Sequence, residues 1–151
     1  MTEVEDFLAS TMPRLTAADD ALHNGDATPR MVLWSHHDPV TLFGAALSAT
    51  GWGEIAPVFE RLASSFSNLQ SSEIELIAVG ASGDLAYTVA IEHTTVSINA
   101  APVTPYKLRA TTVFRREDGE WKVVHRHADP LAGDSPSNLV RQLSSAVQPQ
   151  D

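Results

Sequence analysis

Apolar residues near the N-terminus recur at spacings of three, four or seven positions, which is the repeat of one face of an α-helix. The stripe within residues 3–24 consists of Val4, Phe7, Leu8, Leu15, Ala18 and Leu22. Pro13 interrupts this run, so the pattern predicts either a kinked helix or two short ones. Thr28-Pro29 favours a short helix over 29–34, because proline suits the first helical position. A third amphipathic helix is expected over 51–66.

From Ser71 onward the apolar residues alternate with polar ones, which is the period of a β-strand. Four strands are predicted, at 72–80, 84–99, 103–117 and 120–129. Asp118-Gly119 occupies the turn between the last two, where glycine accepts the positive φ that a tight hairpin needs. Short turns between consecutive strands imply an antiparallel meander.

Shorter elements complete the pattern. Residues 35–44 favour a short strand, and the glycines between residues 44 and 53 favour a loop. A last helix is predicted over 135–147, capped by Ser135 or Ser137. Helices first and antiparallel strands afterwards indicate an α+β fold, with the helices packed on one face of a curved sheet.

The length and composition narrow the class of protein. At 151 residues, the chain is long enough for one domain that buries about 70 % of its unfolded surface. Ten basic and nineteen acidic residues give a net charge of -9, which argues against nucleic acid or anionic lipid as the main partner. No stretch approaches the ~20 apolar residues of a membrane span. Without cysteine there are no disulfides or thiolate metal sites.

The N-terminus is acidic and lacks the basic start and apolar core of a signal peptide. We therefore expect a single domain over residues 1–151, located in the cytoplasm, with a small molecule rather than nucleic acid or membrane as its partner.

The strand at 120–129 carries the most suggestive chemistry, because strict alternation places its odd-numbered residues on one face. Four candidate site residues lie there: Trp121, His125, His127 and Asp129. Lys122 and Arg126 mark the other face as the solvent side, so we predict that the odd-numbered face points inward. The two histidines would then form a pocket floor, one ring holding or protonating a ligand oxygen. Packing in the core and metal binding are the open alternatives.

Residues 34–38, Trp-Ser-His-His-Asp, form a second candidate group at the entry to the first predicted strand. Asp38 is a candidate general base if apolar surroundings raise the pKa of its carboxyl group. Trp34 and His37 are candidate ligand contacts, as is Trp52 on the apolar face of the third helix. The alternative is a capping aspartate beside surface histidines.

Tyr87 and Arg109 lie on the two long strands before the last hairpin. Tyr87 is able to donate a hydrogen bond to an oxyanion, and Arg109 is able to clamp a carboxylate with two hydrogen bonds. Their structural alternatives are a packing tyrosine whose hydroxyl reaches the boundary and an exposed arginine on the sheet. The pattern leaves open which face of strands 84–96 and 103–117 lines a pocket.

The order of these elements, with the segments WSHHDPVTLFG and RREDGEWKVVHRHAD, resembles the nuclear transport factor 2-like superfamily and, within it, the SnoaL-like and ketosteroid-isomerase-like branch. The segment DGEWKVVHRHAD is also similar to the association domain of calcium/calmodulin-dependent kinase II. This resemblance implies a cone-shaped, cystatin-like α+β domain, a deep apolar pocket between sheet and helices, and a homodimer formed through the sheet.

The function implied by the resemblance is that of a stand-alone small-molecule pocket protein. Cofactor-free acid–base chemistry on a small apolar carbonyl compound, as in an isomerase, cyclase or dehydratase, would then use Asp38, His127 and Tyr87. No cofactor or metal is expected, since the chain has no Gly-rich phosphate loop. The alternative is a non-catalytic ligand-binding or oligomerisation module similar to a kinase hub domain, binding small acids through Arg109 or His125.

Overall fold

The computed structural model describes residues 1–44, 47–131 and 138–147. Its first element, α1 (Glu3–His23), is one helix that continues through Pro13, so the predicted run is not split at this proline. Thr2 caps it, because its hydroxyl accepts from the Glu5 N–H and the Glu5 carboxylate accepts from the Thr2 N–H, both at 3.1 Å. This capping box fixes where the helix begins.

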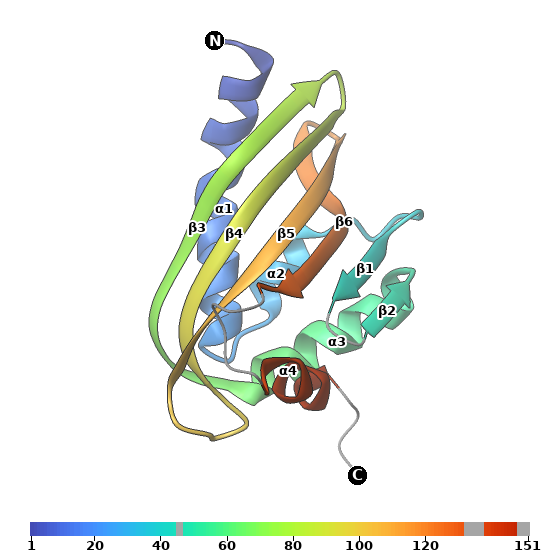
Figure 1. Ribbon diagram of the computed structural model, residues 1–151. Coiled ribbons are helices and arrows are strands. Elements are labelled where there is room, and N and C mark those ends of the chain that lie inside the picture. The colour runs from blue at the N-terminus through green and yellow to red at the C-terminus, as the bar shows by residue number, and fades with distance from the viewer. Residues whose placement is uncertain (45–46, 132–137, 148–151) are drawn as a thin grey trace.

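Six strands form one sheet within the described residues (Figure 1). Their order across the sheet is β2-β1-β6-β5-β4-β3. Their bounds are β1 (Thr41–Gly44), β2 (Leu47–Thr50), β3 (Phe66–Ser82), β4 (Leu85–Ile98), β5 (Thr104–Glu117) and β6 (Glu120–Pro130). β1 runs parallel to β6, and the other neighbouring pairs are antiparallel. The predicted meander is therefore confirmed for β3 to β6, whereas β2 lies in a segment predicted to be a loop.

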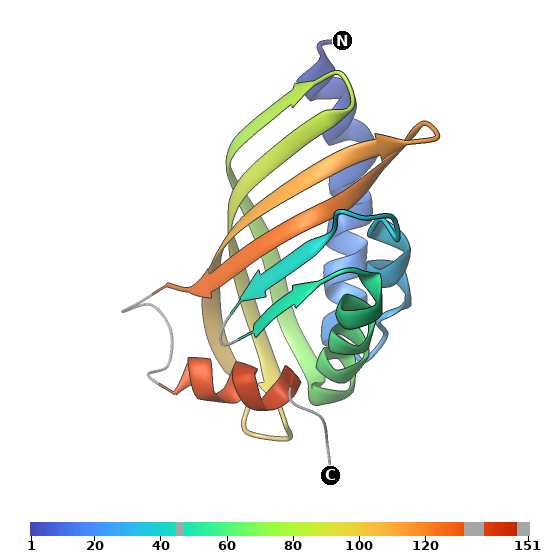
Figure 2. The same ribbon diagram turned by 90° about the vertical axis from the view of Figure 1, so that its right-hand side faces the viewer.

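The first three helices cover one face of this curved sheet (Figure 2). They are α1, α2 (Thr28–Leu33) and α3 (Trp52–Ser65), and the opposite face carries no helix among the described residues. The predicted α+β fold class is confirmed. None of the helices in the described ranges is both long and apolar enough to cross a bilayer.

The last helix, α4 (Leu139–Val147), lies below the end of β6 (Figure 2). The guanidinium of Arg61 on α3 donates to the carbonyl of Val147 at 2.7 Å, which ties α4 to α3. The predicted caps Ser135 and Ser137 lie outside the described residues. α4 thus extends the helical layer over one end of the sheet.

Three aromatic rings join α1 to the sheet. Phe7 of α1 is fully buried, and its ring centre lies 5.0 Å from that of Phe114 and 5.1 Å from that of Trp121. Both contacts are edge-to-face, the arrangement that aromatic quadrupoles favour. Trp121, a predicted ligand contact, is therefore a core residue.

The β5–β6 hairpin turns at Asp118 and Gly119, as the sequence predicts. Both residues have positive φ, 51° and 80°, as the turn that matches the strand twist requires.

A bulge follows on β6. Val113 of β5 pairs with His125, but the next residue, Phe114, pairs with Val123, so Val124 is an extra residue on β6.

This bulge decides which side chains of β6 face the helices. Before it, Trp121 points into the core, and after it Arg126 lines the interior. His125 and His127 consequently lie on the opposite, helix-free face. The prediction that every odd-numbered residue of this strand points inward is wrong beyond Val124, because one inserted residue reverses the alternation.

Candidate functional site

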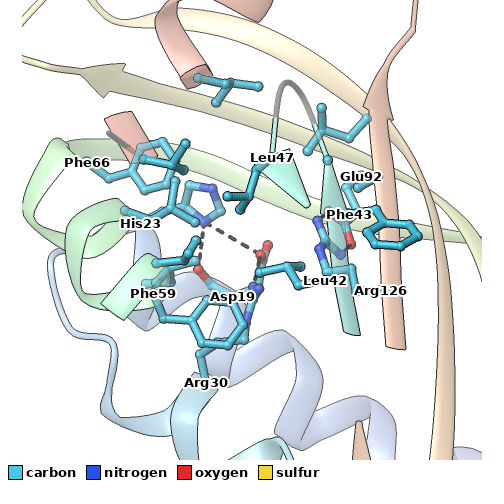
Figure 3. A pocket seen from close by; sticks show the side chains of 18 of the residues that line it. Asp19, His23, Arg30, Leu42, Phe43, Leu47, Phe59, Phe66, Glu92 and Arg126 are labelled. Atoms are coloured by element: carbon cyan, nitrogen blue, oxygen red, sulfur yellow. Dashed lines mark hydrogen bonds and ion pairs between the residues drawn. The ribbon is translucent and has the colours of Figure 1, made fainter. Parts of the chain in front are cut away.

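A cavity of about 90 Å³ lies between the sheet and the helices (Figure 3). Most of its lining is apolar: Leu22, Leu42, Phe43, Leu47, Val58, Phe59, Leu62, Phe66, Leu108, Ala128, Leu143 and Val147. Six polar side chains also line it: Asp19, His23, Arg30, Glu92, Tyr106 and Arg126. A mainly apolar pocket with a few convergent polar groups is the usual form of a small-molecule site.

Asp19 is the centre of the first polar group. It lies one helical turn before His23 on α1, so the two side chains leave the same face of the helix. Arg30 of α2 donates to one carboxylate oxygen at 2.9 Å, and the Ser72 hydroxyl of β3 donates to the other at 2.9 Å. Arg30 also lies 5.6 Å from the centre of the Phe59 ring. The carboxylate therefore joins three elements of the fold.

Glu92 of β4 and Arg126 of β6 form the second polar group. Two parallel hydrogen bonds of 2.7 and 2.6 Å join the guanidinium to the carboxylate. Both side chains are largely buried, at 14 % exposure for Arg126 and 11 % for Glu92. Bidentate geometry makes this the strongest kind of ion pair available to a buried carboxylate.

His23 links the first group to Tyr106 of β5. Its Nδ1 lies 2.7 Å from the backbone carbonyl oxygen of Asp19, and its Nε2 lies 3.1 Å from the Tyr106 hydroxyl. The imidazole also packs against the Phe66 ring in a tilted arrangement, with ring centres 4.4 Å apart. Both ring nitrogens thus have fixed partners beside the cavity.

The buried charges shift one another's pKa. Burial alone would raise the pKa of the Asp19 carboxyl, but the charges of His23, Arg30 and Arg126 outweigh it and hold that pKa below its ordinary value. Burial likewise disfavours the charged form of Arg126, and the Glu92 carboxylate reverses this and raises its pKa.

The pKa of the Tyr106 hydroxyl is shifted for a different reason. Burial and then the nearby carboxylates of Asp19 and Glu92 raise the pKa of its hydroxyl, so it stays protonated.

The two carboxylates and two guanidiniums beside the cavity balance in charge. Since Asp19 pairs with Arg30 and Glu92 with Arg126, both guanidiniums at the cavity already have a carboxylate partner. Within the described residues, no group of three or more His, Asp or Glu side chains is arranged to hold a metal ion. The two hydrogen-bond partners of the His23 imidazole are both uncharged, and its Nδ1 also lies 3.6 Å from the Asp19 carboxylate.

The family model of the SnoaL-like domain matches residues 14–132, which include all six polar residues of the cavity. The chain belongs to the SnoaL-like family. The comparison with curated proteins gives no match.

Solved structures share the fold of this SnoaL-like protein. A candidate dehydratase of the nuclear transport factor 2-like family from Streptomyces avermitilis has a TM-score of 0.68 and 22 % identity, over 85 % of this chain and 99 % of its own. A candidate calcium/calmodulin-dependent kinase II association domain from Thiobacillus denitrificans has a TM-score of 0.65 and 20 % identity, over 81 % of this chain and 95 % of its own. A candidate ketosteroid isomerase from Parabacteroides distasonis has a TM-score of 0.60 and 17 % identity, over 79 % of this chain and 86 % of its own.

Among the described residues that line the cavity, none is a candidate named from the sequence of this SnoaL-like protein. Trp34 and Trp121 are buried in the core, at 2 % and 6 % exposure. His37 and Asp38 are exposed in the segment before β1. Trp52 is half-buried and stacks on His36, with ring centres 3.9 Å apart.

The other five candidates share the helix-free face of the sheet: Tyr87, Arg109, His125, His127 and Asp129. Tyr87 is 44 % exposed. The Thr41 hydroxyl lies 2.7 Å from Nδ1 of His125, and burial and then the neighbouring His127 lower the pKa of His125. His127 lies 3.0 Å from the Asp129 carboxylate. The structure gathers these residues, but outside the cavity.

The sequence gives only a weak indication of the polar residues that line the cavity. Asp19 and His23 interrupt the helical stripe that Leu15 and Leu22 define, and Glu92 alternates with small residues along β4. A charged residue on an apolar face is a sign of a buried pair or a site. The partners could not be found this way, because they come from different elements of the fold.

Proposed function

We propose that this SnoaL-like protein binds a small, uncharged and largely apolar molecule in the cavity and moves a proton at one oxygen of that molecule, without a cofactor. The observation that carries this proposal is the hydrogen bond between His23 and Tyr106 at the wall of a mainly apolar cavity. An anionic ligand would be buried without a free guanidinium to pair with, because Arg30 and Arg126 already bind carboxylates, and such burial is costly. A carbonyl or hydroxyl oxygen carries no such cost.

The proton path follows from the partners of His23. The ligand hydroxyl gives its proton to the phenolic oxygen of Tyr106. At the same time, the proton that Tyr106 carried passes to Nε2 of His23. Tyr106 is neutral before and after the transfer, in agreement with its raised pKa. The ligand oxygen keeps the electron pair of the broken O–H bond. When His23 carries a proton on Nε2, the reverse sequence passes it through Tyr106 to a carbonyl oxygen, whose lone pair forms the new O–H bond. A water molecule then takes a proton from the carbon beside the carbonyl, and the electron pair of that C–H bond forms the double bond of the enol.

The test is hydrogen–deuterium exchange at the carbon atoms beside the carbonyl of cyclohexanone, followed by NMR in D₂O. The wild-type protein is expected to accelerate exchange, and His23→Ala to lower the catalysed rate by about 100-fold or more, the usual contribution of a general acid or base. His127→Ala is the matched control, since this histidine is 52 % exposed on the other face of the sheet.

Equal exchange rates for wild type and His23→Ala would refute proton transfer by this pair. The protein would then be a non-catalytic ligand-binding module, the function that its similarity to a candidate kinase association domain favours.

We also propose that two copies associate through the helix-free face of the sheet. This face exposes Ile77 and Tyr87, at 55 % and 44 %, where a sheet in water would normally be polar. Arg109 and Asp129 are direct neighbours on β5 and β6. In a two-fold interface each patch meets its own copy, so every Arg109 could face the partner's Asp129.

Light scattering after size exclusion tests this association. The wild type is expected to run as a dimer and Ile77→Asp as a monomer, because a buried unpaired carboxylate opposes association. Val140→Asp on α4, where Val140 is 48 % exposed, should leave the dimer intact. A monomeric wild type would rule the interface out, and a larger ring would favour the hub-like alternative.

A further inference from the structure

One helix at the cavity wall lies outside the range that the SnoaL-like family model matches. The match ends at residue 132, and α4 begins at Leu139. Leu143 and Val147 of α4 line the cavity, whereas the other described residues of its lining lie between Asp19 and Ala128. The family match therefore does not account for this part of the wall.

The sequence of α4 places both lining residues on one side of the helix. Leu143 and Val147 are four positions apart, which is about one helical turn, so their side chains leave the same face. Both are buried, at 7 % and 8 % exposure, whereas Val140 is 48 % exposed. The buried side of α4 thus supplies the cavity wall with two aliphatic side chains.

Two hydrogen bonds hold the end of α4 against α3. Arg61 donates to the Val147 carbonyl at 2.7 Å. The Ser65 hydroxyl donates to the Ala146 carbonyl at 3.2 Å. The last carbonyls of a helix have no partner within it, so these contacts satisfy groups that would otherwise stay open. They fix the backbone from which Leu143 and Val147 project, and they give this wall a defined position.

The size of the cavity makes the position of this wall important. A cavity of about 150 Å³ is filled by one benzene molecule, and the cavity between the sheet and the helices measures about 90 Å³. The fit around even a single ring is therefore tight, so the size of each lining side chain limits the size of the ligand.

We infer that Leu143 and Val147 are specificity-determining residues, which set the upper size of the apolar body that the cavity accepts. This inference rests on the proposed function, because it concerns the ligand of the same cavity. It restricts the ligand class to uncharged carbonyl compounds with a body of one small ring, and it assigns the exclusion of larger bodies to α4.

Three cyclic ketones of increasing size measure this limit: cyclopentanone, cyclohexanone and cyclooctanone. Their dissociation constants are measured by NMR titration of the wild-type protein and of Leu143→Ala. Where the cavity has room, the two methylene groups that cyclooctanone adds to cyclohexanone should strengthen binding by about tenfold. Leu143→Ala removes more carbon atoms than cyclooctanone adds, so this variant is expected to show the tenfold gain. The wild type is expected to bind cyclooctanone no more tightly than cyclohexanone.

Val140→Ala is the matched control, since it shortens an exposed side chain of the same helix and should keep the wild-type ratio of the two dissociation constants. The inference is overturned by an equal ratio in the wild type and a folded Leu143→Ala, by a tenfold gain already present in the wild type, or by an equal shift in Val140→Ala. Each of these results leaves the proposed cavity function standing. Failure of the wild type to bind any of the three ketones overturns both. If Leu143→Ala does not fold, Val147→Ala decides by the same ratio, with a smaller shift in the same direction because valine is shorter.

Discussion

Arg126→Met is expected to lower the free energy of unfolding by about 3–5 kcal/mol, the usual cost of leaving one member of a buried ion pair alone. Arg126 donates two hydrogen bonds to Glu92 at 2.6 and 2.7 Å, and methionine keeps much of the apolar length but makes neither. The Glu92 carboxylate would then stay buried without its partner. Urea unfolding measures the change.

Two further variants show that the loss comes from the unpaired charge. Replacing both partners, Arg126→Met with Glu92→Leu, should recover most of the stability, because no buried charge is left alone. Asp84→Ala breaks an ion pair with Arg116 in which the aspartate is 74 % exposed, and it should cost less than about 1 kcal/mol. A loss at Arg126 no larger than that of Asp84→Ala would contradict the strength assigned to the buried pair.

Phe7→Ala is expected to lower the free energy of unfolding by about 3–5 kcal/mol as well, for a different reason. The Phe7 side chain is fully buried and makes edge-to-face contacts with Phe114 and Trp121. Its removal leaves a cavity between α1 and the sheet that the surrounding rings cannot fill. Leu85→Ala is the control, since Leu85 is 57 % exposed and should change stability by less than about 0.5 kcal/mol. Chemical unfolding that gives similar values for both variants would show that α1 is not held by this contact.

The two predictions concern different layers of the same interior. Phe7 lies where the apolar stripe of α1 meets the sheet, and this contact could be expected from the sequence because Phe7 repeats with Leu8, Leu15 and Leu22. Arg126, by contrast, lies in the interior, although the alternation along its strand predicted that it faces solvent. An arginine on a strand is usually exposed, and only the Glu92 carboxylate on β4 explains why this one is inside.

Local sequence determined most of the secondary structure. The period of two from Ser71 onward produced the meander of β3 to β6, and Asp118-Gly119 produced its last hairpin. The helical repeat of the first residues produced α1, even though Pro13 left its continuity open. These features depend on residues within a few positions of each other, and hydrophobic periodicity and turn chemistry report such short-range preferences well. The element order, together with the segments WSHHDPVTLFG and RREDGEWKVVHRHAD, also indicated the family.

The tertiary structure decided where the site lies. One inserted residue, Val124, turned Arg126 inward and the two histidines of β6 outward, and no local pattern marks such a bulge because it arises from the pairing of β6 with β5. The position of the cavity is likewise decided by how distant parts of the chain pack together. Its polar groups come from α1, α2, β4, β5 and β6, and burial gives each of them a partner that is distant in the chain. Periodicity along a sequence shows which positions share a face, but only the packed fold determines which face is inside and which charges meet there.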